Sequence, residues 1–207
     1  MSQLQHHLHL KSGDVGEYVL LPGDPGRAEI IARHFDNATH VATNREYVTY
    51  TGFLDGVKVS VTSTGIGCPS SAIAMEELVR VGAKTFIRVG TSGSIQPGTK
   101  SGELAIVSGA IRDEGTSLHY LPIDFPAVAH YEVVQALRKA AIAKGLSHRV
   151  GISQSKDSFY GEVEPEHSGV TQQLLERWKA WEIGGAICSE MEASTLFILA
   201  SMLRVRA

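Results

Sequence analysis

The chain has 207 residues, of which 43% are hydrophobic and 20% are charged, with a formal net charge of −3. This length and composition predict one soluble globular domain that buries a core without disulfides or metal staples. The weakly negative charge excludes an electrostatic case for binding nucleic acid or an anionic membrane surface.

Two cysteines, Cys68 and Cys188, lie far apart and lack the spacing of metal ligands, which predicts buried free thiols in a reducing compartment. The N-terminus lacks the cationic start and apolar middle of a signal peptide. The longest uncharged apolar stretch, at 193–203, is too short to span a bilayer, which takes about 20 residues. We therefore expect a cytoplasmic protein.

Short apolar runs alternate with helical patterns along most of the chain. A strand is expected at 18–22, followed by a helix at 25–35 with proline in its first turn. Two β-rich runs flank Asp55-Gly56 within 45–64, which predicts a hairpin. The remaining expected elements are a helix at 69–83, strands at 84–95 and 103–111, a helix at 130–144, a strand at 148–155, and helices at 169–183 and 190–203. This order predicts a three-layer α/β/α fold with a central mixed β-sheet, which binds ligands where strands end and helices begin.

The turn between the first strand and the first helix reads Gly-Asp-Pro-Gly-Arg, at 23–27. Glycine allows close approach of a ligand to the backbone, and the helix start offers free N–H groups. Arg27 adds a two-pronged donor suited to phosphate. These features indicate an anion site, although a plain turn without a ligand remains an alternative.

A second candidate anion site follows the strand at 84–95. Arg88 lies within apolar residues, and Gly-Thr-Ser-Gly follows at 90–93. A buried arginine is costly unless it meets an anion or a carboxylate, so both phosphate binding and a buried salt bridge remain open. Arg45, beside Glu46 at the start of the hairpin, reads by itself as a solvated surface charge.

Two acids flank a methionine in Ser-Glu-Met-Glu-Ala-Ser, at 189–194. Acids near a helix start are ordinary capping residues. Alternatively, Glu190 and Glu192 accept hydrogen bonds from vicinal sugar hydroxyls, with Met191 packed against the ribose ring.

Seven motifs, in order, resemble the nucleoside phosphorylase family, and most closely its uridine phosphorylase type. They are PGDPGR, NREYVTY, STGIGCPSSAIAMEEL, IRVGTSGSIQP, DFPAVA, DSFYG and SEMEAS, and the resemblance runs from about His7 to the last residue. It implies a pentosyltransferase in which phosphate attacks C1′ of a nucleoside, expected to be uridine, giving ribose 1-phosphate and free base. An anion held beneath the sugar stabilises its developing oxocarbenium charge, and no cofactor is required.

The resemblance also implies roles for individual residues. The expected phosphate-binding residues are Gly23, Arg27, Arg45, Arg88 and Thr91, with Arg45 supplied by a neighbouring subunit. The expected ribose-binding residues are His7, which reaches across a dimer interface, Glu190, Met191 and Glu192. The expected base-binding residues are Phe159, Glu162 and His167. A structural potassium ion at the dimer interface is expected at Glu46, Ile66 and Ser70, and the family implies homodimers assembled into a homohexamer. For His7, a crowded N-terminal tail with two other histidines is the alternative.

The chain departs from the family in its base-binding segment. Uridine phosphorylases read uracil with a glutamine and an arginine, and the nearest counterparts here are Glu162 and His167. An ionised glutamate only accepts hydrogen bonds, so repulsion from the uracil carbonyls leaves the base specificity open. Family members are also longer, so we treat 1–207 as one nucleoside phosphorylase domain lacking the family's last strand and helix, and expect the natural protein to continue.

Four other functions remain as alternatives. A purine-directed or broad-specificity phosphorylase differs only in the base that it accepts. A nucleosidase would use water as the nucleophile, and water needs no group of arginines to bind it. A nucleoside-binding module would bind without cleavage. A dinucleotide-binding domain is the weakest, because the glycine pattern in Gly-Ile-Gly-Cys-Pro-Ser is only partial.

Overall fold

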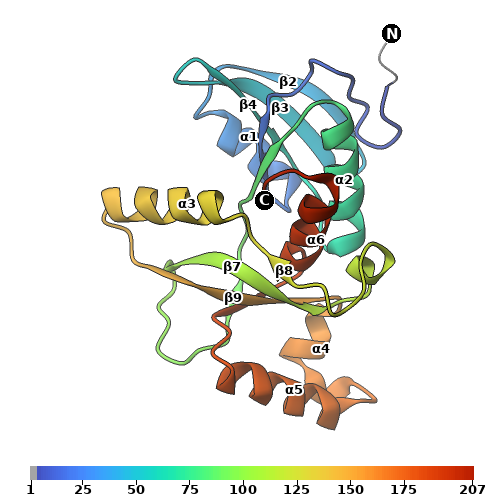
Figure 1. Cartoon of the computed structure of the whole chain (residues 1–207), viewed down its shortest axis with the longest axis vertical. Coiled ribbons are helices and arrows are strands. Elements are labelled where there is room, and N and C mark those ends of the chain that lie inside the picture. Colours follow the sequence, from blue (N-terminus) through green and yellow to red (C-terminus); the bar gives the residue numbers. More distant parts are fainter. Residues whose placement is uncertain (1–3) are drawn as a thin grey trace. The chain divides into compact units, whose positions relative to one another are not determined.

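The computed structural model describes residues 4–207 (Figure 1). Two compact units are present: one holds the described residues up to Gly90 together with Leu199–Ala207, and the other holds Thr91–Ile198. Each unit contains a five-stranded mixed β-sheet with helices packed beside it. The predicted α/β class with mixed sheet is confirmed.

The sheet of the first unit has the strand order β2-β3-β4-β1-β5. These strands are β1 (Tyr18–Leu21), β2 (Asp36–Asn44), β3 (Tyr47–Leu54), β4 (Val57–Thr62) and β5 (Thr85–Arg88). β1 runs parallel to both β4 and β5, whereas β2, β3 and β4 are antiparallel neighbours. Asp55 and Gly56 join β3 to β4 with φ values of 48° and 76°, which is the left-handed pair that a two-residue hairpin requires. The predicted hairpin is therefore confirmed.

Helices cover both faces of this sheet. α1 (Pro25–Ala32) packs on one face, where its alanines meet the β4 valines in a core of Ala28, Ala32, Phe35, Val59 and Val61. On the opposite face, Tyr47 of β3 reaches α2 (Cys68–Arg80), and its hydroxyl donates to the Ser70 carbonyl at 3.0 Å. Alternation along β3 produces this division, because successive side chains of a strand point to opposite faces.

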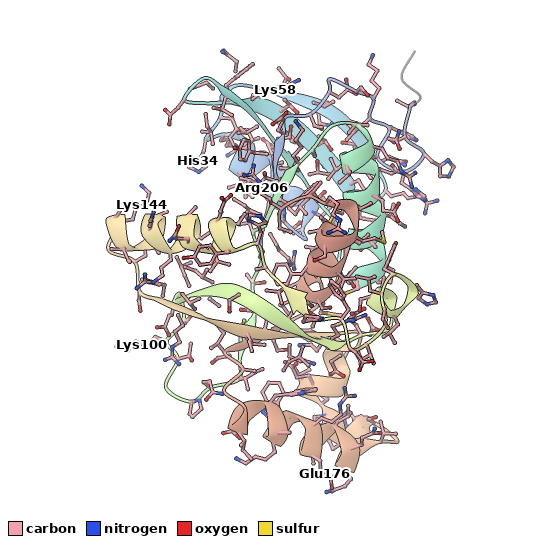
Figure 2. The ribbon with its side chains drawn as sticks, in the orientation of Figure 1. His34, Lys58, Lys100, Lys144, Glu176 and Arg206 are labelled. Atoms are coloured by element: carbon pink, nitrogen blue, oxygen red, sulfur yellow. The ribbon has the colours of Figure 1, made fainter. Side chains whose placement is uncertain are left out.

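The C-terminal residues of the chain extend this sheet beyond β5. The Phe86 amide donates to the Arg206 carbonyl at 2.8 Å, and Thr85 pairs with Arg206 as an isolated parallel bridge. The side chain of Arg206, labelled in Figure 2, donates from Nε to Thr85 Oγ1 at 2.9 Å.

The sheet of the second unit has the strand order β6-β10-β9-β7-β8. Its strands are β6 (Gly93–Ser94), β7 (Leu104–Asp113), β8 (Ala127–Val128), β9 (His148–Lys156) and β10 (Cys188–Glu190). The three central strands are parallel, and the two edge strands pair antiparallel. The helices are α3 (Tyr131–Ala143), α4 (Phe159–Val163), α5 (Thr171–Ile183) and the 3-10 helices Thr116–His119 and Pro165–His167. α6 (Ala193–Leu203) begins in this unit, and its last residues belong to the first.

Exposed charged residues lie directly after α3 and on α5, where Figure 2 labels Lys144 and Glu176. Among residues 4–207, no helix is long and apolar enough to cross a membrane.

Candidate functional site

Gly23 and Arg88 meet at the carboxyl edge of the first sheet. β1 and β5 are parallel with Leu21 opposite Arg88, so both strands end at this edge. A Cβ atom placed on Gly23 would lie 3.8 Å and 3.9 Å from the two terminal nitrogens of Arg88, and 3.2 Å from the Gly65 carbonyl oxygen. Because Gly23 has no side chain, the backbone of this turn lies directly beside the guanidinium group of Arg88. A cationic group beside bare backbone is suited to an oxyanion.

Asp24 caps the helix that starts beside Gly23. Its carboxylate accepts a hydrogen bond from the Gly26 amide at 2.8 Å, with Pro25 at the first helical position. Arg27 Nε lies 4.0 Å from Asp24 Oδ2, and the Arg27 side chain is 42% exposed. An exposed ion pair of this length is weak, so Arg27 is available to turn toward a bound anion.

Gly65 connects the Gly23 turn to the β2–β3 turn. Its amide donates to the Gly23 carbonyl at 2.9 Å, and a Cβ on Gly65 would lie only 2.8 Å from Glu46 Cγ. With φ at 69°, Gly65 adopts a conformation that other residues rarely accept. Arg45, next to Glu46, is exposed on the β2–β3 turn. Thr91, the first residue of the second unit, is also exposed and follows Arg88 by three positions.

The three expected potassium-binding residues lie near one another around the start of α2. Ser70 Oγ donates to the Ile66 carbonyl at 3.2 Å, and the side chain of Glu46 packs against Gly65. Burial, and then the charge of Glu46, raise the pKa of the Tyr47 hydroxyl that bonds the Ser70 carbonyl. A carbonyl, a hydroxyl and a carboxylate are the oxygen ligands that a hard cation prefers. Residues 4–207 contain no group of three or more histidine, cysteine or acidic side chains that could hold a metal.

His7 is held by a buried carboxylate of α2. Glu77, whose side chain is 6% exposed, accepts hydrogen bonds from the His7 and Leu8 amides at 3.0 Å and 2.8 Å, and contacts His7 Nδ1 at 2.8 Å. Burial alone would raise the pKa of Glu77, but the hydrogen bonds from Leu8 and His7 outweigh it and lower that pKa. An ionised carboxylate only accepts, so Nδ1 of His7 donates to it, which leaves Nε2 outside this contact. His7 is thus part of an anchored segment and not of a loose tail.

The acidic segment after β10 divides into two roles. Glu190 accepts hydrogen bonds from the Glu192 and Ala193 amides at 2.8 Å and 2.7 Å, and its other oxygen contacts Ser155 Oγ. These are the contacts of a helix cap, which supports the capping alternative for Glu190. Glu192 is 2% exposed, and Met191, which is partly exposed, lies between the two acids.

Glu162, one of the three expected base-binding residues, lies in a polar cluster. Its Oε2 is 2.5 Å from Lys156 Nζ, and Lys156 Nζ is 5.8 Å from the centre of the Phe159 ring. His167 stands outside this cluster: its side chain is 73% exposed, and its Nδ1 contacts Glu164 Oε2 at 3.1 Å. Glu162 is therefore not an isolated carboxylate, because a lysine balances its charge.

Comparisons with known proteins place the chain in a family. The family model of the phosphorylase superfamily matches residues 17–207. The chain belongs to the phosphorylase superfamily. It is 51% identical over 202 residues to a uridine phosphorylase of Treponema pallidum, covering 98% of this chain and 78% of that protein. It is 47% identical over 209 residues to a uridine phosphorylase of Thermococcus kodakarensis, covering 99% and 74%. A guanosine phosphorylase of Halorubrum lacusprofundi is 40% identical over 203 residues, covering 98% and 80%.

Sequence reasoning about this phosphorylase superfamily member missed two residues. Glu77 lies in an ordinary amphipathic helix pattern, and Lys156 ends a strand, so neither has a local signal. The resemblance itself is confirmed by the family match.

Proposed function

We propose that this chain catalyses the phosphorolysis of uridine, releasing uracil and ribose 1-phosphate. The observation that carries the proposal is the guanidinium group of Arg88 beside Gly23, at the carboxyl edge of a parallel strand pair. Identity of 51% and 47% to two uridine phosphorylases supports the same substrate. The reaction is a pentosyl transfer, in which a phosphate oxygen bonds to C1′ as the C1′–N1 bond breaks. The electron pair of the C1′–N1 bond leaves with the base, which is then protonated.

The phosphate is bound by Gly23, Arg27, Arg88 and Thr91 in this proposal, with Arg45 contributed by a neighbouring subunit. Positive charge fixes the nucleophile, and the bound anion stabilises the oxocarbenium character of the sugar. Because the arginines among these phosphate-binding residues are positively charged, we expect phosphate, and not water, to be the nucleophile.

The ribose is held by Glu192 and Met191, and Glu190 orders their segment by capping α6. A buried carboxylate beside a partly exposed thioether suits vicinal hydroxyls and the face of a sugar ring. In this proposal the ribose 5′-hydroxyl donates a hydrogen bond to Nε2 of His7 from a neighbouring subunit, since Glu77 occupies Nδ1. This exchange of residues requires at least a homodimer with two active sites, and we propose, from the family resemblance, that three such dimers form a homohexamer.

A potassium ion bound by Glu46, Ile66 and Ser70 would rigidify the dimer interface without entering the chemistry. Their proximity near Gly65 supports this role. We place the reaction in the cytoplasm, which is supported by two buried cysteines that form no disulfide within residues 4–207.

The test of the function is the rate of base release from uridine, inosine and guanosine, with and without phosphate. Phosphate-dependent loss of uridine is expected. Much faster cleavage of inosine or guanosine would replace uridine with a purine nucleoside, the second candidate, which the guanosine phosphorylase relative favours. Turnover that persists without phosphate would instead indicate a nucleosidase, and binding without any product would indicate a binding module.

A further inference from the structure

Lys156 is a buried lysine at the end of a central strand. Its side chain is 8% exposed, and its ammonium contacts Glu162 Oε2 at 2.5 Å and Ser189 Oγ at 2.6 Å. Ser189 in turn lies 2.6 Å from Gln154 Oε1, so the pair is built into a hydrogen-bonded network. Removing an ammonium group from water costs free energy. A buried lysine is therefore tolerated only where hydrogen bonds and an opposite charge offset that cost.

The Lys156–Glu162 pair lies beside the residues proposed to hold the nucleoside. β9 and β10 are parallel neighbours whose last paired residues are Ser155 and Glu190, and Lys156 and Met191 are the next residues of the two segments. The ammonium is also 5.8 Å from the ring centre of Phe159, the residue expected to stack on the base. Within the second unit, the ammonium is therefore near the ring expected to stack on the base, at the end of the strand that pairs with the start of the sugar segment.

Hydrogen-bonding capacity remains on both members of the pair. Within residues 4–207 the ammonium has two hydrogen-bond partners, Glu162 and Ser189, and it carries three N–H groups. The side-chain hydrogen bonds to Glu162 in the same part of the chain go to Oε2, which leaves Oε1 as an acceptor. The pair, which has zero net charge, thus offers one donor and one acceptor.

A donor beside an acceptor complements a lactam edge, in which a carbonyl oxygen is adjacent to a ring N–H. Uracil carries this edge, as do the 6-oxopurines. Cytosine and adenine present an amino group and an unprotonated ring nitrogen instead, which would face the ammonium and the carboxylate unfavourably. Such reversed polarity is an effective means of rejecting a wrong ligand.

We propose that Lys156 is a base-specificity residue that donates a hydrogen bond to a carbonyl oxygen of the base, while Glu162 accepts from the adjacent ring N–H. This inference rests on the proposed function and deepens it. The pair takes the part that a neutral glutamine plays elsewhere in the family, since glutamine also offers one donor and one acceptor.

The test measures binding of free bases by calorimetry to the wild-type protein and to Lys156→Met. The bases are uracil, 2-pyrimidinone, which lacks O4, and 4-pyrimidinone, which lacks O2. Loss of a charge-assisted hydrogen bond should weaken uracil binding by about 10- to 100-fold, but change binding of the analogue that lacks the contacted oxygen by less than about threefold. Lys179→Met is the matched control, because Lys179 forms an exposed ion pair with Glu182 at 2.7 Å in the same unit.

Equal weakening of all three bases in Lys156→Met, or no weakening of uracil, would overturn the inference, since a purely structural lysine cannot distinguish the analogues. If Lys156→Met fails to fold, the apolar pair Lys156→Met/Glu162→Leu, which offers neither donor nor acceptor, is measured, and uracil binding should again weaken more than binding of the analogue that lacks the contacted oxygen. Preference for uridine over cytidine should also fall in these variants. A wild-type protein that cleaves no uridine in phosphate would refute the proposed function, whereas an active wild type with unaltered base selectivity in the variants refutes only the role of Lys156.

Discussion

Replacing Glu77 by glutamine should release the N-terminal segment that carries His7. Glu77 accepts hydrogen bonds from two backbone amides and contacts the His7 ring, at distances of 2.8 to 3.1 Å. Glutamine keeps one acceptor oxygen, but its NH2 group faces one of these donors. That donor therefore loses its hydrogen bond. One lost charge-assisted hydrogen bond costs about 1.5–3 kcal/mol, so we expect about 2 kcal/mol.

The destabilisation caused by Glu77→Gln has an upper bound. It cannot exceed the free energy that holds the N-terminal segment in place, because the segment then detaches. Leu8 and Leu10 anchor it and are 1% and 0% exposed. Burial of each leucine is worth about 1.5–3 kcal/mol before the entropy of ordering the segment is subtracted. The predicted 2 kcal/mol therefore raises the local opening equilibrium by about 30-fold without unfolding the unit.

The assay is native-state hydrogen exchange at the His7 and Leu8 amides. Glu76→Gln is the control, since Glu76 is the neighbouring residue and pairs with Arg80 on the surface at 2.7 Å. Exchange in Glu77→Gln should be about 30-fold faster, and exchange in Glu76→Gln should match the wild type. Equal exchange rates in all three proteins would refute the anchoring role of Glu77.

The same carboxylate predicts a pH dependence. The folded-state pKa of Glu77 is lowered from its ordinary value of 4.5, so the unfolded state takes up the proton first as the pH falls. The stability contributed by Glu77 is therefore complete above that value and is lost as the pH falls through the folded pKa. Glu77→Gln should lose less stability than the wild type over this acid range, as measured by denaturant unfolding at each pH.

Three further predictions concern the proposed site and the buried thiol. Arg88→Ala should lower kcat/KM for phosphorolysis by about 100- to 1000-fold, as loss of an oxyanion contact does elsewhere, whereas Arg80→Ala should not; near-normal activity in the first variant would exclude the phosphate role. Glu192→Ala should impair ribonucleosides more than 2′-deoxyribonucleosides, and identical losses would rule out contact with the 2′-hydroxyl. Burial raises the pKa of the Cys188 thiol to about 11, so alkylation by iodoacetamide at pH 8 should require unfolding, and rapid labelling of the native protein would contradict this.

Local sequence was sufficient for the elements that have strong local signals. Proline at the first position of α1 and the Asp55-Gly56 pair each restrict the backbone by themselves, and both were predicted correctly. β2 was missed because it is a polar edge strand, exposed or partly exposed along its whole length and interrupted by register shifts. β10 was missed because three residues are too few to show a period.

The sequence by itself determined which chemical groups this phosphorylase superfamily member offers: glycine turns at strand ends, arginines beside them, and acids flanking a methionine. Only the tertiary structure decided which groups meet. Arg88 lies beside Gly23 because two strands pair in parallel, and Lys156 neutralises Glu162 because a short helix turns back over the end of β9. Contacts such as that between His7 and Glu77 join residues 70 positions apart, and no local pattern encodes a partner at that separation.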